Sequence, residues 1–86
     1  MSVRIYDIKE LKLEDEIIII YNDNNPRVIN YYKVIGKDAR SLVIQNSKYG
    51  SRMLISVNDA TFELHTVYKT DNIPPELQMR IITGLL

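Results

Sequence analysis

Three short apolar segments separated by two turns occupy the middle of the chain and constrain its fold more than any other feature. Residues 28–35, 41–46 and 52–57 are rich in Ile, Val, Leu and Tyr, which favour strands. Gly36 lies in the first intervening turn and Gly50 in the second, each among polar residues that favour chain reversal. This spacing predicts an antiparallel meander of three strands at the centre of the protein.

The alternation of side chains within the meander predicts which of them face a core. Leu42 and Ile44 alternate with polar neighbours, so we expect both to point inward. Met53, Ile55 and Val57 share one face of the third segment. The first segment is apolar on both faces, and its pattern leaves open whether Tyr31 or Tyr32 reaches solvent.

The flanking sequence predicts two more strands and two helical segments. Four consecutive isoleucines at 17–20 predict a strand buried on both faces, and residues 61–68 predict a last strand with Phe62 and Leu64 inward and His65 outward. Asp7 and Glu10 fit a capping box that begins one helical turn, and residues 22–26 predict a loop. A C-terminal helix over 74–85 carries an apolar stripe made of Leu77, Ile81, Ile82 and Leu85.

The order of these elements resembles the SH3-like small β-barrels over residues 11–68. The resemblance rests on the lead-in at 11–17, a loop, the meander, a short turn at 58–60 and a final strand. Glu14-Asp15 stands where many such barrels have Gly-Asp. The resemblance implies a mainly β protein: a small five-stranded antiparallel SH3-like barrel with a short C-terminal α-helix. We expect one domain over 1–86, with a lead-in at 1–14, a barrel at 15–68 and the helix at 74–85. A superfold does not name an activity.

Composition limits the cellular compartment that we expect and the kinds of metal site and cross-link that the chain can form. The absence of cysteine excludes disulfides and thiolate metal sites and fits a reducing compartment. No apolar run is long enough to cross a membrane, and charges near the N-terminus do not suit a signal peptide. Abundant Ile, Asn, Lys and Tyr suggest an AT-rich genome or a virus. We therefore expect a cytoplasmic protein, in the host cytoplasm if it is viral, that binds neither membrane nor metal.

Catalytic signatures are scarce. His65 is the single histidine, and on an outward strand position it is best interpreted as a solvated surface residue. Neither a nucleophile motif nor a phosphate-binding loop occurs. The sequence therefore predicts a protein that is not an enzyme and needs no cofactor.

Positive charge is concentrated in the meander although the net charge is zero. Residues 27–52 hold six lysines and arginines against one acid, whereas both ends of the chain carry more acids than bases. Cations neutralise phosphates and exposed aromatic rings stack on unpaired bases. The candidate residues for binding nucleic acid or an acidic partner are Lys33, Lys37, Arg40, Lys48, Arg52, Tyr31 and Tyr49. Cations at sheet edges also prevent unwanted strand pairing, which is an alternative role for the same residues.

The C-terminal stripe offers a second kind of surface. Leu77, Ile81, Ile82 and Leu85 either anchor the helix in a partner's groove or pack it on the chain's own sheet. The basic middle and acidic ends also suit self-association. We therefore expect a small non-enzymatic binding module, in protein–protein interaction, assembly or regulation, including as a viral or phage accessory protein; the alternative is a nucleic-acid-binding barrel that uses residues 27–52.

Overall fold

Five antiparallel strands form one sheet in the computed structural model, which describes residues 4–22 and 28–83 and, within them, not the side chains of Arg80, Ile81 and Thr83. Apart from Asn22, the loop predicted at 22–26 therefore lies outside the described residues. The strands are β1 (Glu16–Tyr21), β2 (Val28–Lys37), β3 (Ser41–Asn46), β4 (Arg52–Ser56) and β5 (Thr66–Lys69).

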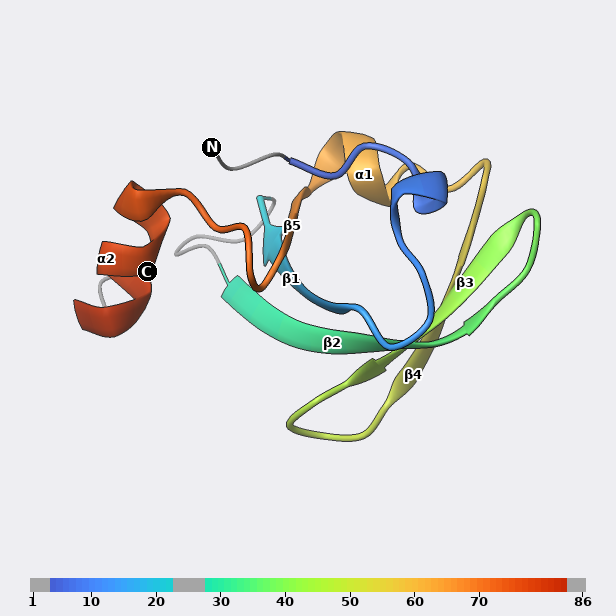
Figure 1. The fold of residues 1–86 in the computed structure, drawn as a ribbon, viewed down its shortest axis with the longest axis horizontal. Helices are drawn as coiled ribbons and strands as arrows, with labels where there is room; N and C mark the ends of the chain where they lie inside the picture. The colour runs from blue at the N-terminus through green and yellow to red at the C-terminus, as the bar shows by residue number, and fades with distance from the viewer. Residues whose placement is uncertain (1–3, 23–27, 84–86) are drawn as a thin grey trace.

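The sheet is strongly curved and open, with the strand order β4-β3-β2-β1-β5 (Figure 1). β4 and β5 are its two edges. A β-bulge between Val34 and Gly36 shifts the register of β2 against β3 and helps bend this long strand. The predicted mainly β fold of five antiparallel strands with a short C-terminal helix is confirmed. Membership of the SH3-like barrels stays a prediction.

The concave, inner face of the sheet holds the main core. Alternate residues of every strand contribute to it, and the lead-in before β1 covers them. Its buried members are Ile5, Ile8, Leu11, Ile17, Ile19, Tyr32, Val34, Leu42, Ile44, Ile55, Phe62 and Val67. Tyr32 is therefore the inward tyrosine, and its hydroxyl lies 2.6 Å from that of Tyr21, whereas Tyr31 is 42% exposed.

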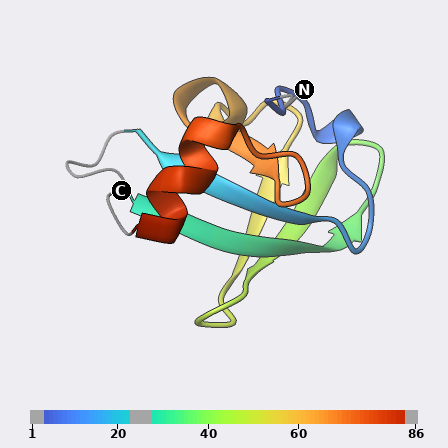
Figure 2. The same ribbon diagram turned by 60° about the vertical axis from the view of Figure 1, so that its left-hand side comes forward.

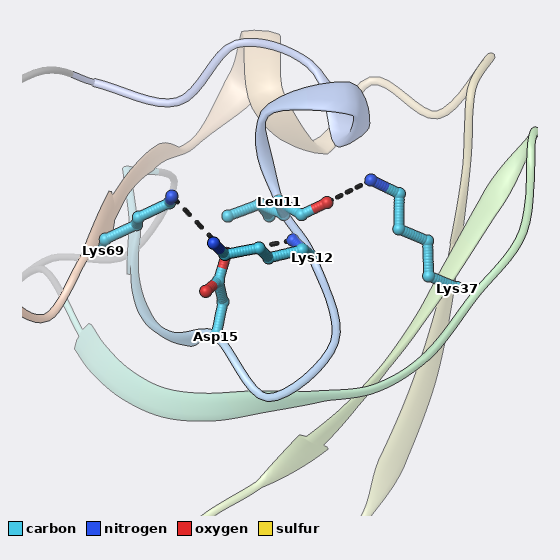
Figure 3. A network of polar contacts seen from close by, with 5 residues as sticks. All are labelled: Leu11, Lys12, Asp15, Lys37 and Lys69. Carbon is cyan, nitrogen blue, oxygen red and sulfur yellow. Dashed lines mark hydrogen bonds and ion pairs between the residues drawn. The ribbon is translucent and has the colours of Figure 1, made fainter.

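The lead-in is fixed to the sheet by polar contacts as well as by burial. The predicted capping box forms: Asp7 and Glu10 close the short 3₁₀ helix η1 (Ile8–Glu10). The Ile5 amide donates to the Val67 carbonyl at 2.8 Å, so the lead-in pairs with the outer edge of β5. Lys69 forms an ion pair with Asp15 at 3.5 Å, on the stretch that leads into β1 (Figure 3).

A second, smaller cluster lies on the outer face of β1. The helix α2 (Pro75–Thr83) lies across this side of the sheet (Figure 2). Leu77 packs with Ile18 and Ile20, the two isoleucines of β1 that point away from the main core, and Ile29, Tyr68 and Ile73 surround them. The predicted burial of residues 17–20 on both faces is confirmed, because one face packs under the lead-in and the other under α2.

The predicted strand at 61–68 is wrong in its first half. Thr61–Leu64 forms the single helical turn α1, and only Thr66–Lys69 is a strand. Asp59 Oδ1 accepts hydrogen bonds from the Thr61 amide and hydroxyl, and these local side-chain bonds favour the turn over the extended chain. Phe62 reaches the core as predicted, but Leu64 is 64% exposed because a helical turn does not alternate its side chains.

Candidate binding surface

The outer face of β2, β3 and β4 brings part of the predicted basic set together. Lys33 of β2 lies opposite Gln45 of β3, which lies opposite Arg52 of β4. The three side chains therefore form a row on one face, with the backbone positions of Lys33 and Arg52 roughly 10 Å apart across two strand spacings. Both Lys33 and Arg52 are exposed.

The turn between β3 and β4 places Lys48 and Tyr49 at the end of this row. The buried Asn46 side chain accepts hydrogen bonds from the Lys48 and Tyr49 amides, each at 2.8 Å, and Gly50 follows with a positive φ of 76°. Lys48 Nζ lies 5.2 Å from the centre of the Tyr49 ring, which is 73% exposed. The hairpin projects away from the lead-in and from α2 (Figures 1 and 2), and both Lys48 and Tyr49 are exposed on it.

Asn46 orders the turn at the candidate surface and was not among the site residues predicted from the sequence. It was predicted as the last residue of the strand at 41–46, yet it is the only polar residue among the buried side chains of the described residues. Its position two residues before Lys48 in Asn-Ser-Lys-Tyr-Gly is a signal for a side-chain-capped turn.

Apolar side chains surround these cations instead of being withdrawn into a core. Ile35 and Tyr31 of β2 and Leu54 of β4 are 36%, 42% and 61% exposed. Two adjoining open concavities run along this region, and both are lined by Asn46, Ser47 and Lys48. One extends to Lys33, Ile35 and Tyr49, and the other to Ile29, Asn30 and Tyr31. The surface thus combines positive charge with exposed aliphatic and aromatic groups.

Lys33 is balanced by an acid from the lead-in. Its ammonium lies 2.9 Å from the Glu14 carboxylate. The hydrogen bond to Glu14 and the charge of Glu14 together raise the pKa of Lys33 above its usual value of 10.5. This stabilising effect is fully present below pH 10.5 and is lost as the pH rises through the raised pKa. Because both side chains are exposed, an incoming acidic group can compete with Glu14 for Lys33.

Lys37 and Arg40 do not join this surface. Lys37 lies opposite Leu42, and its ammonium donates to the Leu11 carbonyl (Figure 3), so it holds the lead-in. Arg40 lies in the turn between β2 and β3, at the other end of the meander, about 17 Å along β3 from the Lys48 turn. Five of the seven predicted residues therefore gather on the candidate surface: Tyr31, Lys33, Lys48, Tyr49 and Arg52. Arg27, which entered the charge count, lies outside the described residues.

The predicted helix surface divides into a buried and an exposed part. Leu77 is 9% exposed and belongs to the cluster with Ile18 and Ile20, so the chain's own sheet occupies it. Ile82 is 78% exposed and Met79 is 62% exposed. The side chain of Ile81 and all of Leu85 lie outside the described residues.

His65 differs from the solvated residue that the sequence predicted. It is half-buried, and its ring meets Tyr21 edge-on with the centroids 4.8 Å apart. Its Nδ1 accepts the Asn22 amide at 3.3 Å. His65 thus packs beside the start of β5, because α1 turns it back toward β1.

Across residues 4–22 and 28–83, no group of three or more His, Asp or Glu side chains is placed to hold a metal ion. No helix in the described part of the chain is both long and apolar enough to cross a membrane. Comparisons with protein-family models, curated proteins and solved structures find no match.

Proposed function

We propose that this chain is a non-enzymatic binding module that holds an acidic segment of a partner protein on the outer face of β2, β3 and β4. One observation carries the proposal: Lys33, Lys48 and Arg52 share this face with exposed Tyr31, Ile35 and Leu54. Protein-binding surfaces combine apolar and aromatic anchors with a charged rim in this way. A role in assembly or regulation, including that of a viral accessory protein in its host's cytoplasm, is part of the proposal.

Zero net charge favours a protein partner over a polyanion. A nucleic-acid-binding domain usually carries a net positive charge that attracts phosphates over long range. Here the net charge of −3 over residues 1–26 and of −2 over residues 53–86 offsets the +5 of residues 27–52, and Glu14 already neutralises Lys33. The remaining attraction acts at short range, where apolar contacts can add to it.

The test compares two charge-matched variants. The site variant combines Lys33→Glu, Lys48→Glu and Arg52→Glu. The control combines Lys9→Glu, Lys12→Glu and Arg40→Glu, which are exposed positions away from the surface. Immobilised wild-type protein and both variants are exposed to proteins of the source cells, and the bound proteins are identified and then measured individually with purified material.

The proposal predicts an acidic partner whose affinity falls at least tenfold for the site variant and stays within about twofold for the control. Loss of one charged contact in an interface commonly weakens binding by 1.4 kcal/mol or more, which is a factor of about ten. Equal binding by both variants would exclude this face as the site.

A second candidate function is supported by Tyr49. Its ring is 73% exposed beside Lys48, and Tyr31 lines the adjoining concavity, so both rings could stack on unpaired bases. Fluorescence anisotropy with labelled single-stranded and duplex oligonucleotides, at low and near-physiological salt, tests this. Binding that falls steeply with salt and is lost in the site variant would make nucleic acid the ligand. The protein-binding proposal predicts no such binding even at low salt.

A further inference from the structure

The two edges of the sheet are treated differently by the rest of the chain. The outer edge of β5 receives the lead-in, through the hydrogen bond from the Ile5 amide to the Val67 carbonyl. The edge of β4 receives no strand from the described residues, since the sheet order ends there. An exposed strand edge presents unpaired amides and carbonyls that can pair with another chain.

The register identifies the backbone groups at this edge. The Asn46 amide bonds to the Ser51 carbonyl and the Val57 amide to the Arg40 carbonyl, so these residue pairs are the hydrogen-bonded kind. Pairs alternate along an antiparallel ladder. Met53 and Ile55 therefore bond to β3, whereas the amides and carbonyls of Arg52, Leu54 and Ser56 point to the open edge.

These outward groups are self-complementary. If two copies of β4 meet antiparallel about Leu54, Leu54 lies opposite Leu54 and Arg52 lies opposite Ser56. Three residue pairs then exchange up to about six backbone hydrogen bonds. No cation faces another cation directly in this register.

Side chains and charge favour the same pairing. Leu54 is 61% exposed and lies next to Val43 on the outer face, so pairing joins Val43 and Leu54 of both copies into one apolar stripe. The basic turn with Lys48 meets the end of the other strand, where exposed Asp59 follows β4. Arg52 protects one end of the edge, but β4 has neither a proline nor a lysine to prevent pairing at its centre.

We propose that the open edge of β4 pairs with β4 of a second copy of this chain, antiparallel and centred on Leu54, to form a symmetric dimer with a continuous sheet. The pairing involves a short strand and buries less surface than a standard interface, so we expect a dissociation constant in the micromolar range or weaker. This inference rests on the backbone groups of the edge and not on the proposed partner, although the side chains of Arg52 and Leu54 belong to both surfaces.

The experiment measures the mass of the full chain by sedimentation velocity from about 10 µM to about 1 mM. The key variant is Leu54→Pro, because proline removes the amide that faces the open edge and leaves the bonds from Met53 and Ile55 to β3 in place. Leu54→Lys is a second variant that keeps the backbone and adds a charge at the centre. Circular dichroism confirms that each variant is folded.

The expected result is a monomer–dimer equilibrium for the wild type, weakened at least tenfold in both Leu54 variants. Ile82→Ser on the exposed side of α2 and Lys33→Glu on the basic face are controls that should leave it unchanged. A wild type that stays monomeric to about 1 mM would overturn the inference. So would a dimer that persists in folded Leu54→Lys, or one that Ile82→Ser abolishes, since the latter would place the interface on α2.

Discussion

The outer face of the sheet has two halves that the chain treats in opposite ways. Over β1, the apolar residues Ile18 and Ile20 are buried because α2 returns and places Leu77 on them. Over β2, β3 and β4, the apolar residues Tyr31, Ile35 and Leu54 stay exposed beside Lys33 and Arg52. We call this part of the outer face the bare half. The comparison shows that the same residue types serve stability in one half and are available for binding in the other, according to whether a later segment covers them.

Two apolar residues of the outer face should differ most in what they contribute to the free energy of unfolding. Ile18→Ala should lower the free energy of unfolding by about 3 kcal/mol, because Ile18 is fully buried and its removal leaves a cavity under α2. Leu54→Ala should change it by less than about 0.5 kcal/mol. Urea denaturation measures both. Similar losses for the two variants would show that the bare half is covered in solution.

The next prediction concerns Asn46, whose side chain orders the turn at the end of the bare half. Asn46→Ala should destabilise the protein by about 1–2 kcal/mol, because the amides of Lys48 and Tyr49 lose their buried acceptor. Ser47→Ala, at the neighbouring exposed position, is the control and should be nearly neutral. Urea denaturation gives the stabilities, and amide hydrogen exchange at Lys48 and Tyr49 should accelerate in the first variant alone. Unchanged exchange there would contradict the role given to Asn46.

Glu14 links the lead-in to the bare half at a conformational cost. Its φ is 75°, in the left-handed region that favours glycine. Glu14→Gly relieves this strain and Glu14→Ala keeps it, while both lose the ion pair with Lys33. Glu14→Gly should therefore be more stable than Glu14→Ala by about 1 kcal/mol in thermal or urea unfolding. An Ala variant as stable as the Gly variant would argue against the left-handed backbone.

The smallest effect lies at the end of the meander away from the candidate surface. The hydrogen bond from the Arg40 amide, with those from the Ser41 hydroxyl and amide, lowers the pKa of Asp38. A lowered carboxyl pKa stabilises the fold above the unfolded value near pH 4, and this contribution is lost as the pH falls below it. Stability between about pH 5 and pH 2 should therefore fall more gently in Asp38→Asn than in the wild type. Equal slopes in acid denaturation would contradict the assignment.

Local rules in the sequence predicted most of the elements. The three strands of the meander, the capping box at Asp7 and Glu10, and the two-sided burial of residues 17–20 follow from turn residues, side-chain period and β-branching. The first strand is longer than predicted, because β2 continues through Gly36, which was placed in the turn, to Lys37. The helical turn α1 was missed because its signal is a single aspartate, Asp59, which competes with a strand-like pattern. Such short-range competition is poorly resolved by periodicity alone.

The concentration of cations between residues 27 and 52 can be read from the sequence, because it depends only on the order of the residues along the chain. Which of these cations lie together depends on strand pairing and packing. Strand register places Lys33 in one row with Arg52. The bulge in β2 and the position of the lead-in instead bring the Lys37 ammonium to the Leu11 carbonyl. The packing of α2 on β1 made Leu77 part of a core, whereas no described segment packs on Leu54, because burial depends on which distant segment packs against a residue.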